Sequence, residues 1–129
     1  MHAPLAASAE NAGTRLLDAA FEVHRKLGPG LLESVYEICV CHELGKLDVP
    51  FQRQVCLPVH YDGIEIDAGL RLDIVIANEV IAELKAVETI LPVHEAQLIT
   101  YLKLTGMRLG FLINFNVPLL KNGIRRFVL

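Results

Sequence analysis

Residues 72–85, with the sequence LDIVIANEVIAELK, contain the pattern that decides the fold of this chain. Apolar residues dominate both halves of the segment, and Val and Ile are common among them, as in β-strands. The tripeptide Ala77-Asn78-Glu79 between the two halves has the composition of a turn. The segment therefore predicts two antiparallel strands joined by a tight loop.

Strand alternation assigns the side chains of this hairpin to two faces. In the first strand we expect Leu72, Ile74 and Ile76 on one face, and Asp73 with Val75 on the other. In the second strand Glu83 and Lys85 share a face, because they are two residues apart. A three-residue loop would place Asp73 opposite Glu83, with their Cβ atoms roughly 4.5–5.5 Å apart. A two-residue loop would instead place Asp73 opposite Leu84, on the wrong face.

The rest of the chain predicts helices and further strands around this hairpin. Helical spacing of apolar residues precedes and follows Gly28-Pro29-Gly30, and the period changes from 3.6 to 2 after Phe51. The predicted helices are 14–27, 31 to about 45–47, and 92–104; the predicted strands are 51–59, 64–76 with a bulge at Gly69, 80–87, 109–115 and 124–128. The order ααβββαββ predicts an α/β fold of the α+β type, with helices packed on a mixed central sheet.

Composition limits the number of domains and the classes of function. A chain of 129 residues fits one domain, which we expect to span residues 14–129 after a tail at 1–13. No apolar run is long enough to cross a bilayer, and the first residues do not resemble a signal peptide. The three cysteines lack metal-site spacing, so we expect buried, reduced thiols. These features together predict a cytoplasmic protein.

The formal net charge of −3 weighs against a strong sequence-independent nucleic-acid binder. The last quarter of the chain is nevertheless basic, with Lys103, Arg108, Lys121, Arg125 and Arg126. These residues form either a local positive rim around an acidic centre or an ordinary solvated surface, and composition alone favours the surface.

Two carboxylates opposite one another in apolar strands repel unless something compensates them. A divalent cation would do so, since Mg²⁺ prefers oxygen ligands and commonly uses one or two carboxylates. Asp73 and Glu83 therefore form a candidate metal site, where a bound metal acidifies water and steadies a phosphate. Lys85 on the same face would stabilise charge or help to activate the water. The alternative is an ordinary ion pair between Glu83 and Lys85 on an exposed strand.

Two helices carry further polar side chains. Glu33 and Tyr36 project from one side of the second helix, although the helix dipole alone explains a glutamate in a first turn. In the third helix His94, Gln97 and Tyr101 form a polar stripe. A solvated face is the ordinary meaning of such a stripe, but Tyr101 is less typical of it.

Residues 30–36, GLLESVY, resemble the signature of the GxxExxY protein family. The resemblance continues in the same order through 71–73 (RLD), 83–88 (ELKAVE), 92–102 (PVHEAQLITYL) and 112–115 (LINF), and covers roughly residues 14–128. That family is placed in the PD-(D/E)XK nuclease superfamily. The resemblance implies that Asp73 is the motif aspartate, Glu83 the second acid and Lys85 the lysine. One departure is that Leu72, rather than proline, precedes Asp73.

The resemblance also implies roles for the residues on the helices. Glu33 is similar to the acidic residue that a helix before the sheet often supplies, as a further metal ligand or base. Gln97 and Tyr101 resemble the QxxxY motif of the exonuclease-like branch, which would orient either the substrate phosphate or the residues around the metal ligands. The leading hypothesis is a Mg²⁺- or Mn²⁺-dependent nuclease acting on DNA, working as a homodimer. The rivals are a non-catalytic nucleic-acid- or protein-binding module with the same fold, and a small-molecule or metal-handling protein.

Overall fold

A computed structural model describes residues 3–129. Three α-helices, five strands and one short 3₁₀ helix follow one another in the predicted order. They are α1 (Ala7–Leu27), α2 (Glu33–Lys46), β1 (Phe51–Tyr61), β2 (Ile64–Ile76), β3 (Val80–Lys85), α3 (Pro92–Thr105), β4 (Leu109–Asn114), η1 (Leu120–Gly123) and β5 (Ile124–Val128). The predicted α+β class and the order ααβββαββ are therefore confirmed.

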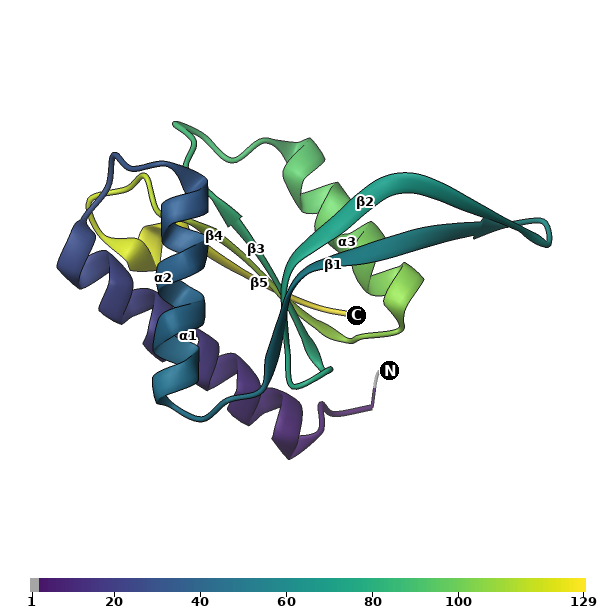
Figure 1. The fold of residues 1–129 in the computed structure, drawn as a ribbon, viewed down its shortest axis with the longest axis horizontal. Helices are drawn as coiled ribbons and strands as arrows, with labels where there is room; N and C mark the ends of the chain where they lie inside the picture. Colours follow the sequence, from purple (N-terminus) through teal and green to yellow (C-terminus); the bar gives the residue numbers. More distant parts are fainter. Residues whose placement is uncertain (1–2) are drawn as a thin grey trace.

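The five strands form one mixed sheet in which the spatial order follows the chain, β1-β2-β3-β4-β5 (Figure 1). All neighbouring strands are antiparallel except β3 and β4, which are parallel. A parallel pair needs a crossover connection, and α3 supplies it. The crossover places α3 directly after the strand that carries Glu83 and Lys85.

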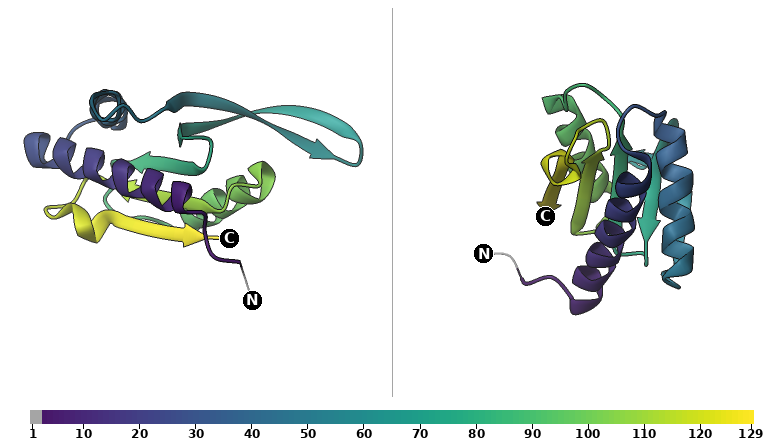
Figure 2. Two further views of the ribbon diagram at one scale, coloured as in Figure 1. Left: turned by 90° about the horizontal axis from the view of Figure 1, so that it is seen from below. Right: turned by 90° about the vertical axis from the view of Figure 1, so that its left-hand side faces the viewer.

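Helices cover both faces of the sheet, α1 and α2 on one side and α3 on the other (Figure 2). The larger apolar cluster joins α1 and α2 to the sheet through residues such as Leu16, Tyr36 and Phe111. The smaller cluster joins α3 to the opposite face, and Leu98 and Leu102 are fully buried in it. Burial of β4 along its whole length follows from this cover on both faces.

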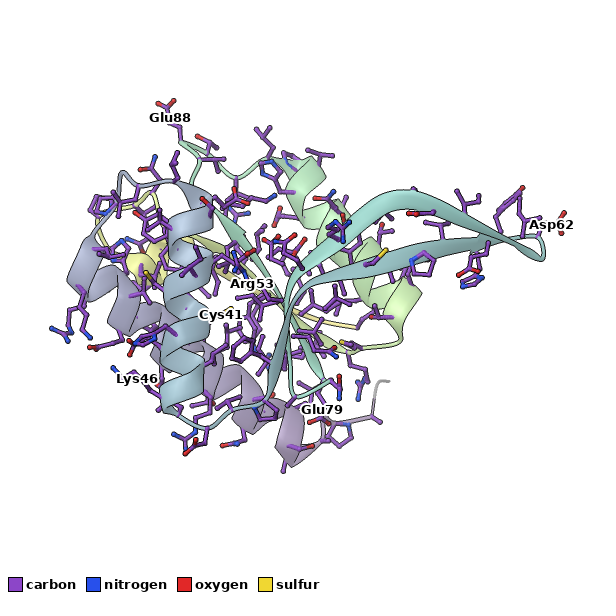
Figure 3. The ribbon with its side chains drawn as sticks, viewed as in Figure 1. Cys41, Lys46, Arg53, Asp62, Glu79 and Glu88 are labelled. Atoms are coloured by element: carbon purple, nitrogen blue, oxygen red, sulfur yellow. The ribbon has the colours of Figure 1, made fainter. Side chains whose placement is uncertain are left out.

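The hairpin of β1 and β2 projects beyond the body as an arm (Figure 1). Residues 60–69 are all exposed, and Asp62 lies at the tip (Figure 3). The predicted irregularity at Gly69 is present: Gly69 has a φ of 70°, and the strand register shifts between Leu57 and Val59 opposite it.

Two element boundaries differ from the predictions. Residues Ala7–Gly13, expected in the tail, are the first turns of α1, and the helix uses Ala9 and Ala12 as buried contacts. Small residues give a weak apolar signal, so the pattern was visible only from Leu16 onward. The strand expected to reach Val87 ends at Lys85, because the Asn114 amide bonds both the N–H and the C=O of Val87.

The three cysteines are free thiols, but only Cys41 is buried. Burial raises the pKa of the Cys41 thiol to about 11, so this thiol is unreactive. Cys39 is partly buried, and Cys56 is exposed on β1, which contradicts the expectation that all three are buried. Within residues 3–129 no helix is both long and apolar enough to cross a membrane.

Candidate active site at a fork in the sheet

The predicted register of the central hairpin is confirmed. Ile74 pairs with Ala82 and Ile76 with Val80, so the loop between them has three residues. The backbone ladder between β2 and β3 stops at Ile74 and Ala82, one position before Asp73 and Glu83 would meet. The two strands therefore separate at the acidic pair, and the sheet opens into a fork there.

Each acidic side chain bridges the fork to the backbone of the other strand. The Asp73 N–H donates to Oε2 of Glu83 at 2.8 Å, and the Leu84 N–H donates to Oδ2 of Asp73 at 2.8 Å. Carboxylates replace the carbonyl partners that a continued ladder would have supplied. The two carboxylates are thus held close together by reciprocal bonds.

The expected alternation of β2 fails at Asp73. Ile74 and Ile76 pack in the larger cluster beneath α1 and α2, as one face requires, but Leu72 packs with Val75 in the α3 cluster. The expected shared face of Leu72, Ile74 and Ile76 is therefore wrong for Leu72. The partner strand is irregular at the same level, because Gln54 opposite Asp73 has a φ of 54°. These irregularities lie at the level where the β2–β3 ladder ends and the arm separates from β3.

Burial and mutual repulsion dominate the electrostatics of the pair. Desolvation, and then the nearby charges of Glu37 and Glu33, raise the pKa of Asp73 to about 6, against the bond from Leu84 and the charge of Lys85. Desolvation, followed by repulsion from Asp73, raises the pKa of Glu83 to about 8. A carboxyl with a pKa of about 8 keeps its proton at neutral pH, and a cation between the two groups would favour the ionised form of both.

The loop before α2 places Glu33 beside this pair. The buried Tyr36 hydroxyl donates to the Gly28 carbonyl at 2.6 Å and accepts from the Leu31 N–H at 3.1 Å. Its ring stacks on Phe115, with the ring centres 4.5 Å apart. The tyrosine of the GxxExxY-like segment thus fixes the start of α2. Glu33 is exposed in the first turn, and its charge contributes to the raised pKa of both carboxyls.

Lys85 and Tyr101 approach the pair from the side of α3. Lys85 is half-buried at the end of β3, and its charge lowers the pKa of both carboxyls. Tyr101 is buried, and desolvation followed by the charges of Glu83 and Asp73 raises the pKa of its phenol. Gly110 on β4 lets α3 lie close to the sheet, since a Cβ there would stand 3.1 Å from Leu98.

Gln97 lies one turn before Tyr101 and is exposed, with no side-chain hydrogen bond to the described residues. The site residues predicted from the sequence therefore fall into two sets. Asp73, Glu83, Lys85 and Tyr101 interact with one another at the fork, and Glu33 acts on the pair through its charge. Gln97 faces solvent on the helix that carries Tyr101.

Sequence reasoning missed a second polar cluster next to Asp73. Glu37 is 6 % exposed and pairs with Arg53 and Gln54, both on β1. A signal existed: Glu37 is four residues after Glu33, so the two carboxylates lie on one side of α2. Asn114 was also missed; it is buried and fixes the segment after Lys85 through Val87.

The donor set fits a hard divalent cation with few protein ligands. Oδ1 of Asp73 and Oε1 of Glu83 accept no hydrogen bond from residues 3–129, so one oxygen of each carboxylate is free for a metal. Within that range no three Asp, Glu, His or Cys side chains converge closely enough to hold a metal ion. The pair alone suits Mg²⁺, which usually keeps several waters and completes its shell with substrate phosphate.

Comparison with protein families places the chain in a known class. A model described as PD-(D/E)XK nuclease superfamily matches residues 10–127. The chain therefore belongs to the PD-(D/E)XK nuclease superfamily, whose nucleases generally use divalent metals. The narrower assignment to the GxxExxY family stays a prediction. Comparisons with curated proteins and with solved structures gave no match.

Proposed function

We propose that this protein is a divalent-metal-dependent nuclease that hydrolyses phosphodiester bonds in DNA. The observation that carries the proposal is the carboxylate pair of Asp73 and Glu83 at the fork. Two acids are held together in a partly desolvated position, with a free oxygen on each and a lysine beside them. Such an arrangement costs stability without a cation, which is typical of a functional site rather than a structural one.

Each residue at the fork has a distinct proposed role. Asp73 and Glu83 would hold Mg²⁺ or Mn²⁺. Glu33, which does not converge with them as a third direct ligand, would be the base that takes a proton from water. The bound metal would lower the pKa of that water and offset charge on the phosphate. Lys85 would stabilise the negative charge that develops during attack. Gln97 and Tyr101 would orient the phosphate from α3.

A cleavage assay with a panel of metals tests the proposal. Wild-type protein should convert plasmid or linear DNA in Mg²⁺ or Mn²⁺ and not in EDTA, while Asp73→Asn should lose the activity. Glu88→Gln is the matched control, because Glu88 is an exposed carboxylate three residues after Lys85 that points away from the body (Figure 3). DNA binding without cleavage in any metal would support the non-catalytic binding module instead.

We also propose that the protein is a cytoplasmic homodimer. The outer half of the arm supports the dimer, because Tyr61 and Ile64 are 68 % and 57 % exposed and pair on one face of the hairpin. The same face packs against α3 closer to the body, through Leu57 and Leu70. The apolar face of the arm therefore extends past the part that α3 covers. The uncovered part is suited to burial against another protein surface.

A further inference from the structure

The Glu37 cluster holds an arginine beside the fork. Arg53 on β1 donates its Nε–H to Oε2 of Glu37 at 2.6 Å, and Nε2 of Gln54 donates to Oε1 of Glu37 at 2.7 Å. The Glu37 side chain is 8 % exposed, whereas the Arg53 side chain is 42 % exposed. A buried carboxylate is thus satisfied at both oxygens, and it fixes the stem of a guanidinium whose outer end faces solvent.

The ion pair leaves most of the guanidinium unused. Arginine pairs with a carboxylate frequently through two parallel bonds. Here Gln54 takes the second oxygen of Glu37, so Arg53 binds through Nε alone. The two terminal nitrogens of Arg53 donate to no acceptor within residues 3–129. A role limited to neutralising Glu37 does not explain this geometry, whereas a planar pair of free N–H donors suits a phosphate.

Arg53 lies next to the acidic pair, on the opposite face from Lys85. In the strand register Arg53 pairs with Ile74, the neighbour of Asp73. Ile74 packs in the cluster beneath α1 and α2, and Figure 3 shows Arg53 between α2 and the base of the arm. Lys85 continues the face of Ile81, which packs toward α3. The two cations therefore flank the fork from its two sides.

Acidic groups outnumber basic groups around the fork. Glu33, Glu37, Asp73 and Glu83 contribute four acidic groups, against the two basic groups of Lys85 and Arg53. A polyanion entering this field is repelled unless cations meet it directly. Lys85 and the metal would contact the phosphodiester that is cleaved. A neighbouring phosphate of the same strand would therefore require a different cationic side chain.

We propose that Arg53 is a phosphate-binding residue for the nucleic-acid backbone, contacting a phosphate next to the one that is cleaved. Glu37 and Gln54 are positioning residues that hold its guanidinium toward the fork. The inference rests on the proposed function and adds a binding contact on the α2 side. Gln54 keeps a positive φ in this arrangement, which is the kind of local strain that functional sites retain.

Binding measurements with a cleavage-deficient protein test the inference. Fluorescence anisotropy of a labelled duplex DNA is measured with Asp73→Asn, alone and combined with Arg53→Gln. Loss of one phosphate contact should weaken binding about three- to tenfold and reduce the slope of log affinity against log salt by about one. Arg126→Gln is the matched control, since Arg126 pairs with Glu10 at the same 2.6 Å and is 48 % exposed. It lies on β5, at the far edge of the sheet.

Two further variants keep the test decisive. Arg53→Gln leaves Glu37 buried without its partner, so the double change Glu37→Gln with Arg53→Gln removes both charges together and should fold. Arg53→Lys should bind more weakly than wild type, because an ammonium lacks the planar pair of donors. Equal DNA affinity and salt slope in the Arg53 and Arg126 variants would overturn the inference while leaving the proposed function intact. Failure of Asp73→Asn and of wild type to bind DNA at low salt would overturn both.

Discussion

Glu83→Gln tests the electrostatic description of the fork most directly. Glutamine keeps the shape of the side chain and an oxygen that accepts the Asp73 N–H, but it carries no charge. The pKa of Glu83 is raised from 4.5 to about 8 in the folded protein. A carboxyl with a raised pKa contributes stability that is fully present below pH 4.5 and is lost as the pH rises through 8.

The magnitude follows from the size of this shift. Each pKa unit corresponds to about 1.4 kcal/mol, so the shift of the Glu83 carboxyl sets an upper bound of roughly 4–5 kcal/mol for complete ionisation. The free oxygen of Glu83 still meets solvent, which screens a large part of the penalty. We therefore expect Glu83→Gln to be more stable than wild type by about 2 kcal/mol at pH 8, and nearly equal to it at pH 5.

Thermal melts in EDTA at pH 5 and pH 8 measure this difference. For a chain of this size the gain at pH 8 corresponds to roughly 5–10 °C in melting temperature. Glu88→Gln removes an exposed carboxylate from the same region and should show no comparable dependence on pH. Comparing variants at each pH cancels the titration of every group that the Glu83 charge does not influence. A Glu83→Gln protein that is no more stable than wild type at pH 8, or equally stabilised at both pH values, would refute the reasoning.

Three other predictions use the same purified protein. At pH 8, Mg²⁺ or Mn²⁺ at a hundredfold excess over its dissociation constant should stabilise wild type by about 2.7 kcal/mol. Glu83→Gln should lose this gain in the same melts. A wild-type melting temperature that neither ion changes would argue against a metal site. Tyr36→Phe should lower the free energy of unfolding in urea by about 1–3 kcal/mol, because the two loop backbone groups that bond the hydroxyl lose their partner. An unchanged midpoint of urea unfolding would contradict that role. Tyr61→Ser with Ile64→Ser should convert a dimer to a monomer in light scattering, whereas a wild-type monomer at all concentrations would exclude the dimer.

The sequence predicted the parts of the site that depend on short-range patterns. The apolar alternation and the three-residue loop at Ala77–Glu79 set the register, and the register brings Asp73 and Glu83 together. Lys85 follows from the same alternation. These features involve residues close in the chain, where a shift of one position would expose a whole apolar face and is therefore strongly disfavoured.

The parts that could not be predicted depend on contacts between distant segments. Leu72 changes face at the level where Gln54 on β1 has a positive φ, and Gln54 bonds Glu37, seventeen residues earlier in the chain. In the sequence Glu37 is an ordinary helix glutamate, and nothing local shows that α2 docks with this side chain against β1. Burial alone would make the carboxylate unfavourable; the bonds from Arg53 and Gln54 make it tolerable. The bonds that satisfy this one buried charge thus involve the irregular part of β1 opposite Asp73, and they leave the outer end of Arg53 free beside the fork.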